Sequence, residues 1–243
     1  ESIVKRGYGL VTAYYGELDP DFDDDFKNGV HSLFPRNGEA NEWATISGWA
    51  WGLHRIADYL ATNDAIAADQ LIVMGHSRLG KAALWAGATD PRFAAVISNN
   101  SGCGGAALSR RAYGETLLRI NGNFPHWFND RFKQYNEKEA ELPMDQHGLI
   151  ALIAPRPVLV TSAEGDRWAD PRGEFLSAYH ASPVYKLFSD PGLGEVEFPK
   201  PAIDSLLGEG AIRYRHRPGK HDVTYEDWQA YMAFADQLVR DKK

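Results

Sequence analysis

The sequence contains a single cysteine, Cys103, which excludes an internal disulfide and any CxxC metal motif. No apolar run approaches the ~18 residues of a membrane helix, and the first residues do not resemble a signal peptide. Basic residues are outnumbered, 26 against 33 acidic ones, which gives a formal net charge of −7. This balance argues against nucleic acid or an anionic membrane surface as a partner. The histidines show no metal-ligand spacing, so no metal site is expected.

Composition and length favour one globular unit. Hydrophobic residues make up 44% and charged residues 24% of the 243 residues, as in soluble globular domains. No repeat, low-complexity tract or Pro/Gly/Ser-rich linker divides the chain. We therefore expect a single catalytic domain over 1–243, or the C-terminal part of a longer domain.

Short apolar runs alternate with segments of helical periodicity, and this order predicts an α/β sandwich with a mostly parallel sheet. Strands are expected at 8–15, 71–74, 94–98, 157–161 and 211–216. Helices are expected at 42–61, from 78, at 145–154, 171–180 and 182–188, and from 225. Residues 106–154 form an insertion between strands.

The stretch Leu71-Ile-Val-Met-Gly-His-Ser-Arg-Leu-Gly-Lys81 organises the chain. An apolar run ends at Gly75 and an Ala-rich helical run begins at Arg78, which places Ser77 on the corner between strand and helix. A serine there resembles the nucleophile elbow of the α/β-hydrolases. Gly75 and Gly80 leave room for a strained turn and close helix packing. The alternative is an ordinary βα turn with a serine N-cap.

Partners for Ser77 follow in the order acid, then histidine, that this superfamily uses. His221 lies in the loop after the last expected strand, where the general base belongs, and His216 is its nearest competitor. Asp166 lies in the loop after the 157–161 strand and is the expected acid, with Glu164 and Asp170 as alternatives.

Two further features remain open in the sequence. Arg78 follows Ser77 directly, so its N–H and guanidinium are candidates to stabilise an oxyanion, the alternative being a surface salt bridge. The alternating acids Asp19, Asp21, Asp23 and Asp25 lack the glycine and terminal glutamate of an EF-hand. We expect a solvated loop there rather than a cation site.

The segment Gly75-His-Ser-Arg-Leu-Gly-Lys81 resembles the Gly-x-Ser-Arg-x-Gly-Lys motif of the glucuronoyl esterases, carbohydrate esterase family 15. The resemblance extends over Tyr14-Tyr-Gly-Glu-Leu-Asp-Pro-Asp-Phe, Ser101-Gly-Cys-Gly-Gly, Phe124-Pro-His-Trp-Phe and Ile153-Ala-Pro-Arg-Pro-Val-Leu. It implies a cofactor-free serine esterase that cleaves 4-O-methyl-glucuronate esters between xylan and lignin alcohols. It also implies a secreted or periplasmic protein.

Carried over by motif, Ser77 is the nucleophile and Arg78 the oxyanion stabiliser. Lys81 is then a contact to glucuronate hydroxyls, with Glu115 and Trp168 lining the sugar site. The alternatives are a surface lysine, a surface glutamate and a buried tryptophan.

Two departures from the family pattern stand out. Asn100 occupies the place of a family glutamate, so it is expected to support the site by hydrogen bonding rather than to supply the acid. The first strands of the family's sheet are also absent. A less selective carbohydrate or acetyl esterase, and an inactive homologue that binds uronate-bearing polysaccharide, therefore remain alternatives. The oligomeric state is not indicated.

Overall fold

The computed structural model describes residues 2–240, so the ends of the expected 1–243 domain lie outside the described residues. The strands are β1 Leu71–His76, β2 Phe93–Asn99, β3 Val158–Ala163, β4 Leu206–Leu207 and β5 Ile212–Arg217. The α-helices are α1 Ser2–Lys5, α2 Tyr15–Leu18, α3 Thr45–Leu60, α4 Arg78–Thr89, α5 Leu117–Asn123, α6 Asp130–Lys133, α7 Gln146–Ala151, α8 Pro171–Lys186 and α9 Tyr225–Arg240.

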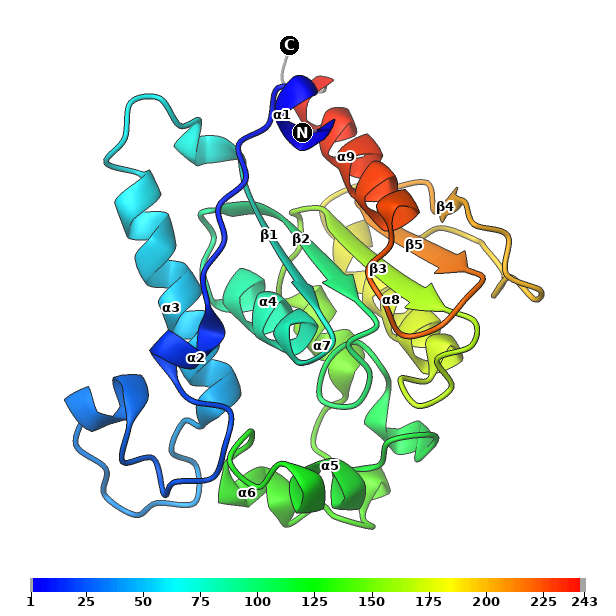
Figure 1. The fold of residues 1–243 in the computed structure, drawn as a ribbon. Coiled ribbons are helices and arrows are strands. Elements are labelled where there is room, and N and C mark those ends of the chain that lie inside the picture. Colours follow the sequence, from blue (N-terminus) through cyan, green and yellow to red (C-terminus); the bar gives the residue numbers. More distant parts are fainter. Residues whose placement is uncertain (1, 241–243) are drawn as a thin grey trace.

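The sheet has the order β1-β2-β3-β5-β4. Its first four strands in this order run parallel, and only the short β4 pairs antiparallel to β5. Helices α3, α4, α7 and α8 pack on one face, whereas α9 packs on the other (Figure 1). The result is the three-layer α/β/α arrangement that the alternation of strands and helices predicts.

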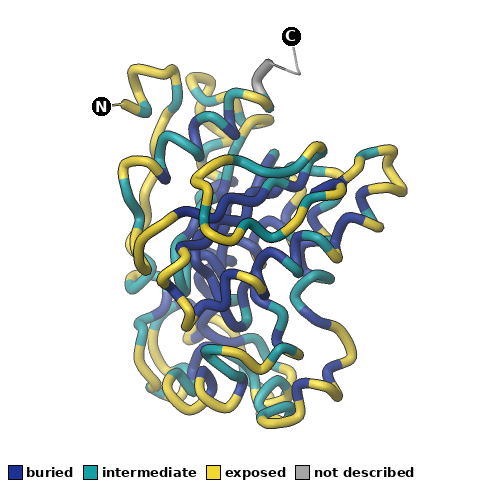
Figure 2. The backbone as a smooth tube through the Cα atoms, turned by 90° about the vertical axis from the view of Figure 1, so that its right-hand side faces the viewer, coloured by how far each residue is buried: buried dark blue, intermediate teal, exposed yellow. Residues whose placement is uncertain are grey.

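Alternate residues of the strands pack into the two hydrophobic cores on opposite faces of the sheet. In β3, Val158 and Val160 belong to the large core beneath α4, α7 and α8, while Leu159 contacts the smaller core beneath α9. This follows from the two-residue period of side chains along a strand. Figure 2 shows the strands as a buried band inside exposed loops. Within the described part of the chain, no helix is long and apolar enough to cross a bilayer.

Two expectations for secondary structure were wrong. Residues 8–14 form no strand, and α2 begins at Tyr15. The apolar run is exposed, with Leu10 and Val11 both more than half accessible, and residues 2–240 offer it no neighbouring strand. A strand needs a neighbouring strand to pair the hydrogen-bonding groups of its backbone, so a strand-like composition alone is not enough to form a strand here.

The second error concerns α8, which is one helix and not two. Pro183 lies inside it, and the helix continues to Lys186. Ala178, Ala181 and Tyr185 are fully buried along the same helix. Packing of this face holds the helix together across a residue that removes one backbone donor.

Candidate active site

The turn from β1 into α4 has the predicted strained geometry. Ser77 adopts φ 57° and ψ −126°, outside the regions that non-glycine residues usually occupy. A Cβ on Gly75 would lie 1.9 Å from the carbonyl oxygen of Leu79, so only glycine allows this approach. The turn therefore places Ser77, which is half-buried, at the carboxyl edge of the sheet and at the start of α4.

Loops after β3 and β5 bring a histidine and a carboxylate together at the same edge. His221 Nδ1 lies 2.5 Å from Asp166 Oδ2. Asp166 is buried, whereas the His221 side chain is 44% exposed. The other two candidate acids are engaged elsewhere. Asp170 pairs with Arg111 at 2.6 Å, and exposed Glu164 accepts a hydrogen bond from the backbone of Ala202.

His216, the competing histidine, lies within β5, is buried, and places Nδ1 2.9 Å from the carbonyl of Pro199. Its ring is therefore engaged with the 198–199 segment, and it makes no hydrogen bond to Asp166 among the described residues. His221 instead reaches the elbow, since its ring centroid lies 4.4 Å from that of His76, the residue before Ser77. Burial lowers the pKa of His76 to about 4, and repulsion from His221 acts in the same direction. A neutral His76 adds no positive charge beside a protonated His221.

The Ser77 hydroxyl has no hydrogen-bond partner among the described residues. Its backbone is fixed, because Ser77 N–H donates to the carbonyl of Asn99 at 2.9 Å. The Ser77–His221 contact that acyl transfer requires is not formed here, although such contacts are often long without substrate. What the fold supplies is a half-buried serine on a strained turn, next in sequence to His76, whose ring lies against that of His221.

The guanidinium of Arg78 is held by Asp21, which the sequence indicated only as one of four alternating acids. Arg78 Nη1 pairs with Asp21 Oδ2, and its Cζ lies 4.9 Å from the ring centroid of Trp127. Asp21 also accepts hydrogen bonds from Trp127 Nε1 at 2.7 Å and His126 Nε2 at 3.0 Å. Burial raises the pKa of Asp21, but these hydrogen bonds and Arg78 outweigh it, so the pKa lies below its usual value.

The expected solvated loop at 19–25 is thus partly wrong. Asp19 is buried and lies 3.4 Å from His31 Nε2, and Asp21 anchors Arg78. The acids farther along the loop, Asp23 and Asp25, are exposed. No cluster of three His, Cys, Asp or Glu side chains able to hold a metal occurs among the residues that the structure describes. The signal that could have identified Asp21 was its place in the Asp-Pro-Asp-Phe motif.

The three predicted sugar-site residues differ in accessibility. Trp168 is 47% exposed and its carbonyl accepts the N–H of Glu115 at 2.9 Å, so the backbones of these two residues lie side by side. Lys81 is neither exposed nor free, because its Nζ donates to the carbonyl of Ser101 at 2.5 Å and the residue is 4% exposed. Burial lowers the pKa of Lys81, and the nearby Glu115 opposes this shift. The alternative of a surface lysine is therefore wrong.

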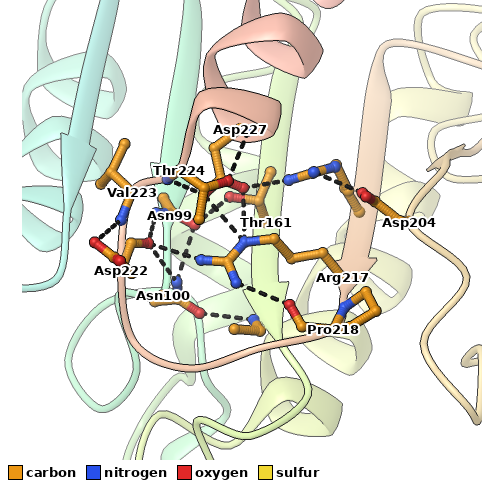
Figure 3. Close-up of polar contacts among 12 residues, drawn as sticks. Asn99, Asn100, Thr161, Asp204, Arg217, Pro218, Asp222, Val223, Thr224 and Asp227 are labelled. Carbon is orange, nitrogen blue, oxygen red and sulfur yellow. Dashed lines mark hydrogen bonds and ion pairs between the residues drawn. The ribbon is translucent and has the colours of Figure 1, made fainter.

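Asn100 has a positive φ of 46°, and in the described part of the chain its side chain makes no hydrogen bond to His221. Its Oδ1 accepts the N–H of Ala163 at 2.8 Å, and its Nδ2 donates to Asn99 Oδ1 at 3.1 Å. Nδ2 also lies 3.5 Å from the carbonyl of Asp222 (Figure 3). Asn100 therefore connects the ends of β2 and β3 to the loop that carries His221.

Glu174, on α8, is a buried carboxyl that sequence analysis missed. Its Oε1 accepts the N–H of Gly102 at 2.9 Å, and its Oε2 accepts the hydroxyl of Ser162 at 2.5 Å. Burial raises the pKa of Glu174 to about 7. Glu174 thereby ties the glycine-rich loop after β2 to the end of β3. A glutamate on a helix of low amphipathicity gives no sequence signal of this role.

A hollow of about 450 Å³ lies beside the loop of His221. Its lining includes Arg217, His221 and Glu226 but not Ser77 or Trp168. We therefore assign no substrate to it.

Comparison with known proteins gives consistent results. The family model described as glucuronyl esterase, fungi, matches residues 21–189. Carbohydrate esterase MZ0003, from an unknown prokaryotic organism, is 52% identical over 240 residues, covering 97% of this chain and 55% of that protein. A 4-O-methyl-glucuronoyl methylesterase 1 from Wolfiporia cocos (strain MD-104) is 31% identical over 193 residues, covering 75% of this chain and 47% of that protein.

Among solved structures, a promiscuous CE15 esterase from the marine bacterial metagenome is 51% identical and superposes with a TM-score of 0.90. The match covers 98% of this chain and 60% of that one. The chain spans about half the length of the curated relatives that it matches.

Proposed function

The chain belongs to the glucuronoyl esterases, carbohydrate esterase family 15, and on this premise we propose that it hydrolyses esters of glucuronic acid. Its fold is the α/β-hydrolase fold that the sequence predicts. The substrate class we propose is a 4-O-methyl-glucuronate ester on xylan, with a lignin alcohol as the leaving group. Such a substrate lies outside the cell, so the proposal includes secretion or export to the periplasm.

In the proposed reaction, Ser77 Oγ attacks the ester carbonyl while His221 Nε2 takes its proton. Asp166, on Nδ1 of the same ring, fixes the tautomer and stabilises the imidazolium. The alcohol leaves with the proton from His221, and water then hydrolyses the acyl-enzyme by the same route. Arg78, at the first position of α4, offers its N–H, which has no intrahelical acceptor, and its guanidinium to the oxyanion.

The observation that carries this proposal is the Asp166–His221 pair at the loop ends beside the strained Ser77 elbow. The three residues follow one another along the chain in the order that the superfamily uses. Trp168 supports the choice of a sugar substrate, because an exposed indole offers an apolar face to a pyranose ring. Glu115 adjoins Trp168 through a backbone hydrogen bond and adds a carboxylate to the electrostatic surroundings of the buried Lys81.

The test compares hydrolysis of benzyl glucuronate with hydrolysis of a simple acetyl ester in the intact protein. We expect a much higher kcat/KM for the glucuronate ester, and Ser77→Ala should remove this activity by about three orders of magnitude or more. Ser32→Ala, at an exposed turn, is the matched control. Retention of more than about a tenth of the rate by Ser77→Ala would contradict the assignment of the nucleophile.

A less selective carbohydrate esterase is the second candidate, favoured by the likeness to a solved esterase whose description calls it promiscuous. Equal kcat/KM values for glucuronate and acetyl esters would favour it. Binding of a uronate polysaccharide without hydrolysis of either ester would instead identify an inactive homologue.

A further inference from the structure

The loop that carries His221 has little packing of its own. Residues 218–222, which join β5 to the segment before α9, are all exposed. A base must nevertheless be held to well under an ångström for efficient proton transfer. Something beneath the loop must therefore restrain its backbone.

Arg217, the last residue of β5, makes that restraint. It is 4% exposed, and its guanidinium donates to the carbonyls of Pro218 and Asp222, each at 2.9 Å (Figure 3). These two carbonyls lie on either side of His221 in the sequence. One planar group thus bonds to both ends of the short loop, a geometry that the fixed fork of arginine allows.

Asp227, on α9, holds Arg217 in place. Arg217 Nε donates to Asp227 Oδ1 at 2.8 Å and to Oδ2 at 3.0 Å, and Asp227 is completely buried. Asp227 also caps its own helix, because Oδ2 accepts the N–H of Thr224 at 2.7 Å and Thr224 Oγ1 accepts the N–H of Asp227 at 3.2 Å. The carboxylate is therefore fixed by the start of α9 and by β5 together.

A second set of contacts joins this loop to the rest of the site. The carbonyl of Asp222 also accepts Asn99 Nδ2 at 3.1 Å, from the end of β2. Gly165 N–H donates to the carbonyl of Gly219 at 2.8 Å, which links the loop to that of Asp166. The carbonyl of Asp222 therefore accepts hydrogen bonds from Arg217 and also from Asn99 on β2, the strand next to β1.

We propose that Arg217, oriented by Asp227, is a positioning residue that holds His221 in register with Asp166 and Ser77. The inference rests on the proposed function for its kinetic consequence, but its structural consequence is independent of any substrate. If Arg217 no longer bonds to both carbonyls, the loop gains freedom and the His221–Asp166 hydrogen bond is populated for less of the time.

Arg217→Lys tests this most sharply. Lysine keeps the charge beside Asp227, but an ammonium lacks the planar fork that reaches both carbonyls. The matched control is Arg215→Gln, two residues earlier on β5. Arg215 is equally buried and pairs with Asp227 and Asp204, yet it makes no hydrogen bond to residues 218–222 in the described part of the chain.

Two readouts are taken in the intact protein. Steady-state kinetics on benzyl glucuronate should show kcat lowered by about 10- to 100-fold in Arg217→Lys, with KM nearly unchanged. In Arg215→Gln, kcat per folded molecule should stay close to the wild-type value. Proton NMR should show a downfield His221 Nδ1–H signal, assigned by its loss in Asp166→Asn. This signal should persist in Arg215→Gln and be lost in Arg217→Lys.

The outcomes separate cleanly. Wild-type kcat together with a retained Nδ1–H signal in Arg217→Lys would overturn the proposal. Equal losses in both arginine variants would also overturn it, because the cluster would then contribute only to stability. If the wild-type protein hydrolyses no glucuronate ester, the proposed function fails, and the NMR comparison alone still decides the role of Arg217.

Discussion

His221 Nδ1 and Asp166 Oδ2 lie 2.5 Å apart although 55 positions separate the two residues. The sheet explains this, because β3 and β5 are neighbours in register, with Ala163 opposite Arg217. Both loops therefore leave the sheet level with each other, and the N–H of Glu164 donates to the carbonyl of Arg217 at 2.8 Å. Strand order, rather than distance along the sequence, pairs the acid with the base.

From this pair we expect Asp166→Asn to lower kcat by about 10²- to 10⁴-fold, since an amide neither offsets the imidazolium charge nor selects the same tautomer. The measurement is kcat on benzyl glucuronate in protein shown to be folded. Asp222→Asn is the matched control, because Asp222 adjoins His221 but, among residues 2–240, its carboxylate accepts a hydrogen bond only from the N–H of Val223. Unchanged kcat in Asp166→Asn would reject Asp166 as the acid.

We expect Arg78→Ala to lower kcat by roughly 10²- to 10³-fold with little change in KM, because charge on the oxyanion develops in the transition state. Arg78→Lys should recover part of the rate, since a lysine can still pair with Asp21 but lacks the fork. Arg92→Ala, which removes an arginine paired with Asp90 and Asp58, serves as the control. An effect confined to KM would make Arg78 a ground-state binding residue.

The exposed indole of Trp168 predicts an effect on binding. Trp168→Ala should raise KM for benzyl glucuronate by roughly 10-fold and leave a simple acetyl ester almost unaffected, because only the sugar ring can stack on the indole. Tyr59→Ala removes an aromatic side chain that is more exposed and lies on α3. If Trp168→Ala raises KM equally for both esters, Trp168 shapes the loop of Asp166 and does not bind sugar.

The buried carboxyl of Glu174 predicts a pH dependence of stability. Its pKa is raised from 4.5 to about 7 in the folded protein, so its contribution to stability is fully present below pH 4.5 and is lost as the pH rises through about 7. The free energy of unfolding of wild type should therefore fall more between pH 5 and pH 8 than that of Glu174→Gln.

Denaturant unfolding at the two pH values measures this difference. Glu195→Gln, an exposed carboxylate, should keep the wild-type pH dependence. Equal pH dependence in wild type and Glu174→Gln would show that Glu174 has the same pKa in the folded and unfolded states.

Local patterns in the sequence predicted most of the elements that position the site. The strand–Gly-x-Ser–helix order around Ser77, the strand before Asp166 and the strand before His221 all appear where they were expected. These features depend on side-chain period and on glycines at fixed offsets, which a single sequence contains. The chain order of Ser77, Asp166 and His221 is likewise a property of the sequence alone.

Only the tertiary structure decided which charged groups meet. Residues 8–14 have the composition of a strand, but no neighbouring strand is available to them among residues 2–240. Asp21 reaches Arg78 across 57 positions and Glu174 reaches Gly102 across 72, distances over which no periodic signal extends. Arg215 and Arg217 alternate along β5, and only the packing of α9 on the sheet makes Asp227 their shared partner. The sequence by itself therefore determined the secondary-structure elements and their order. The ion pairs that orient the site depend on the tertiary structure, because only folding brings these distant side chains together away from water.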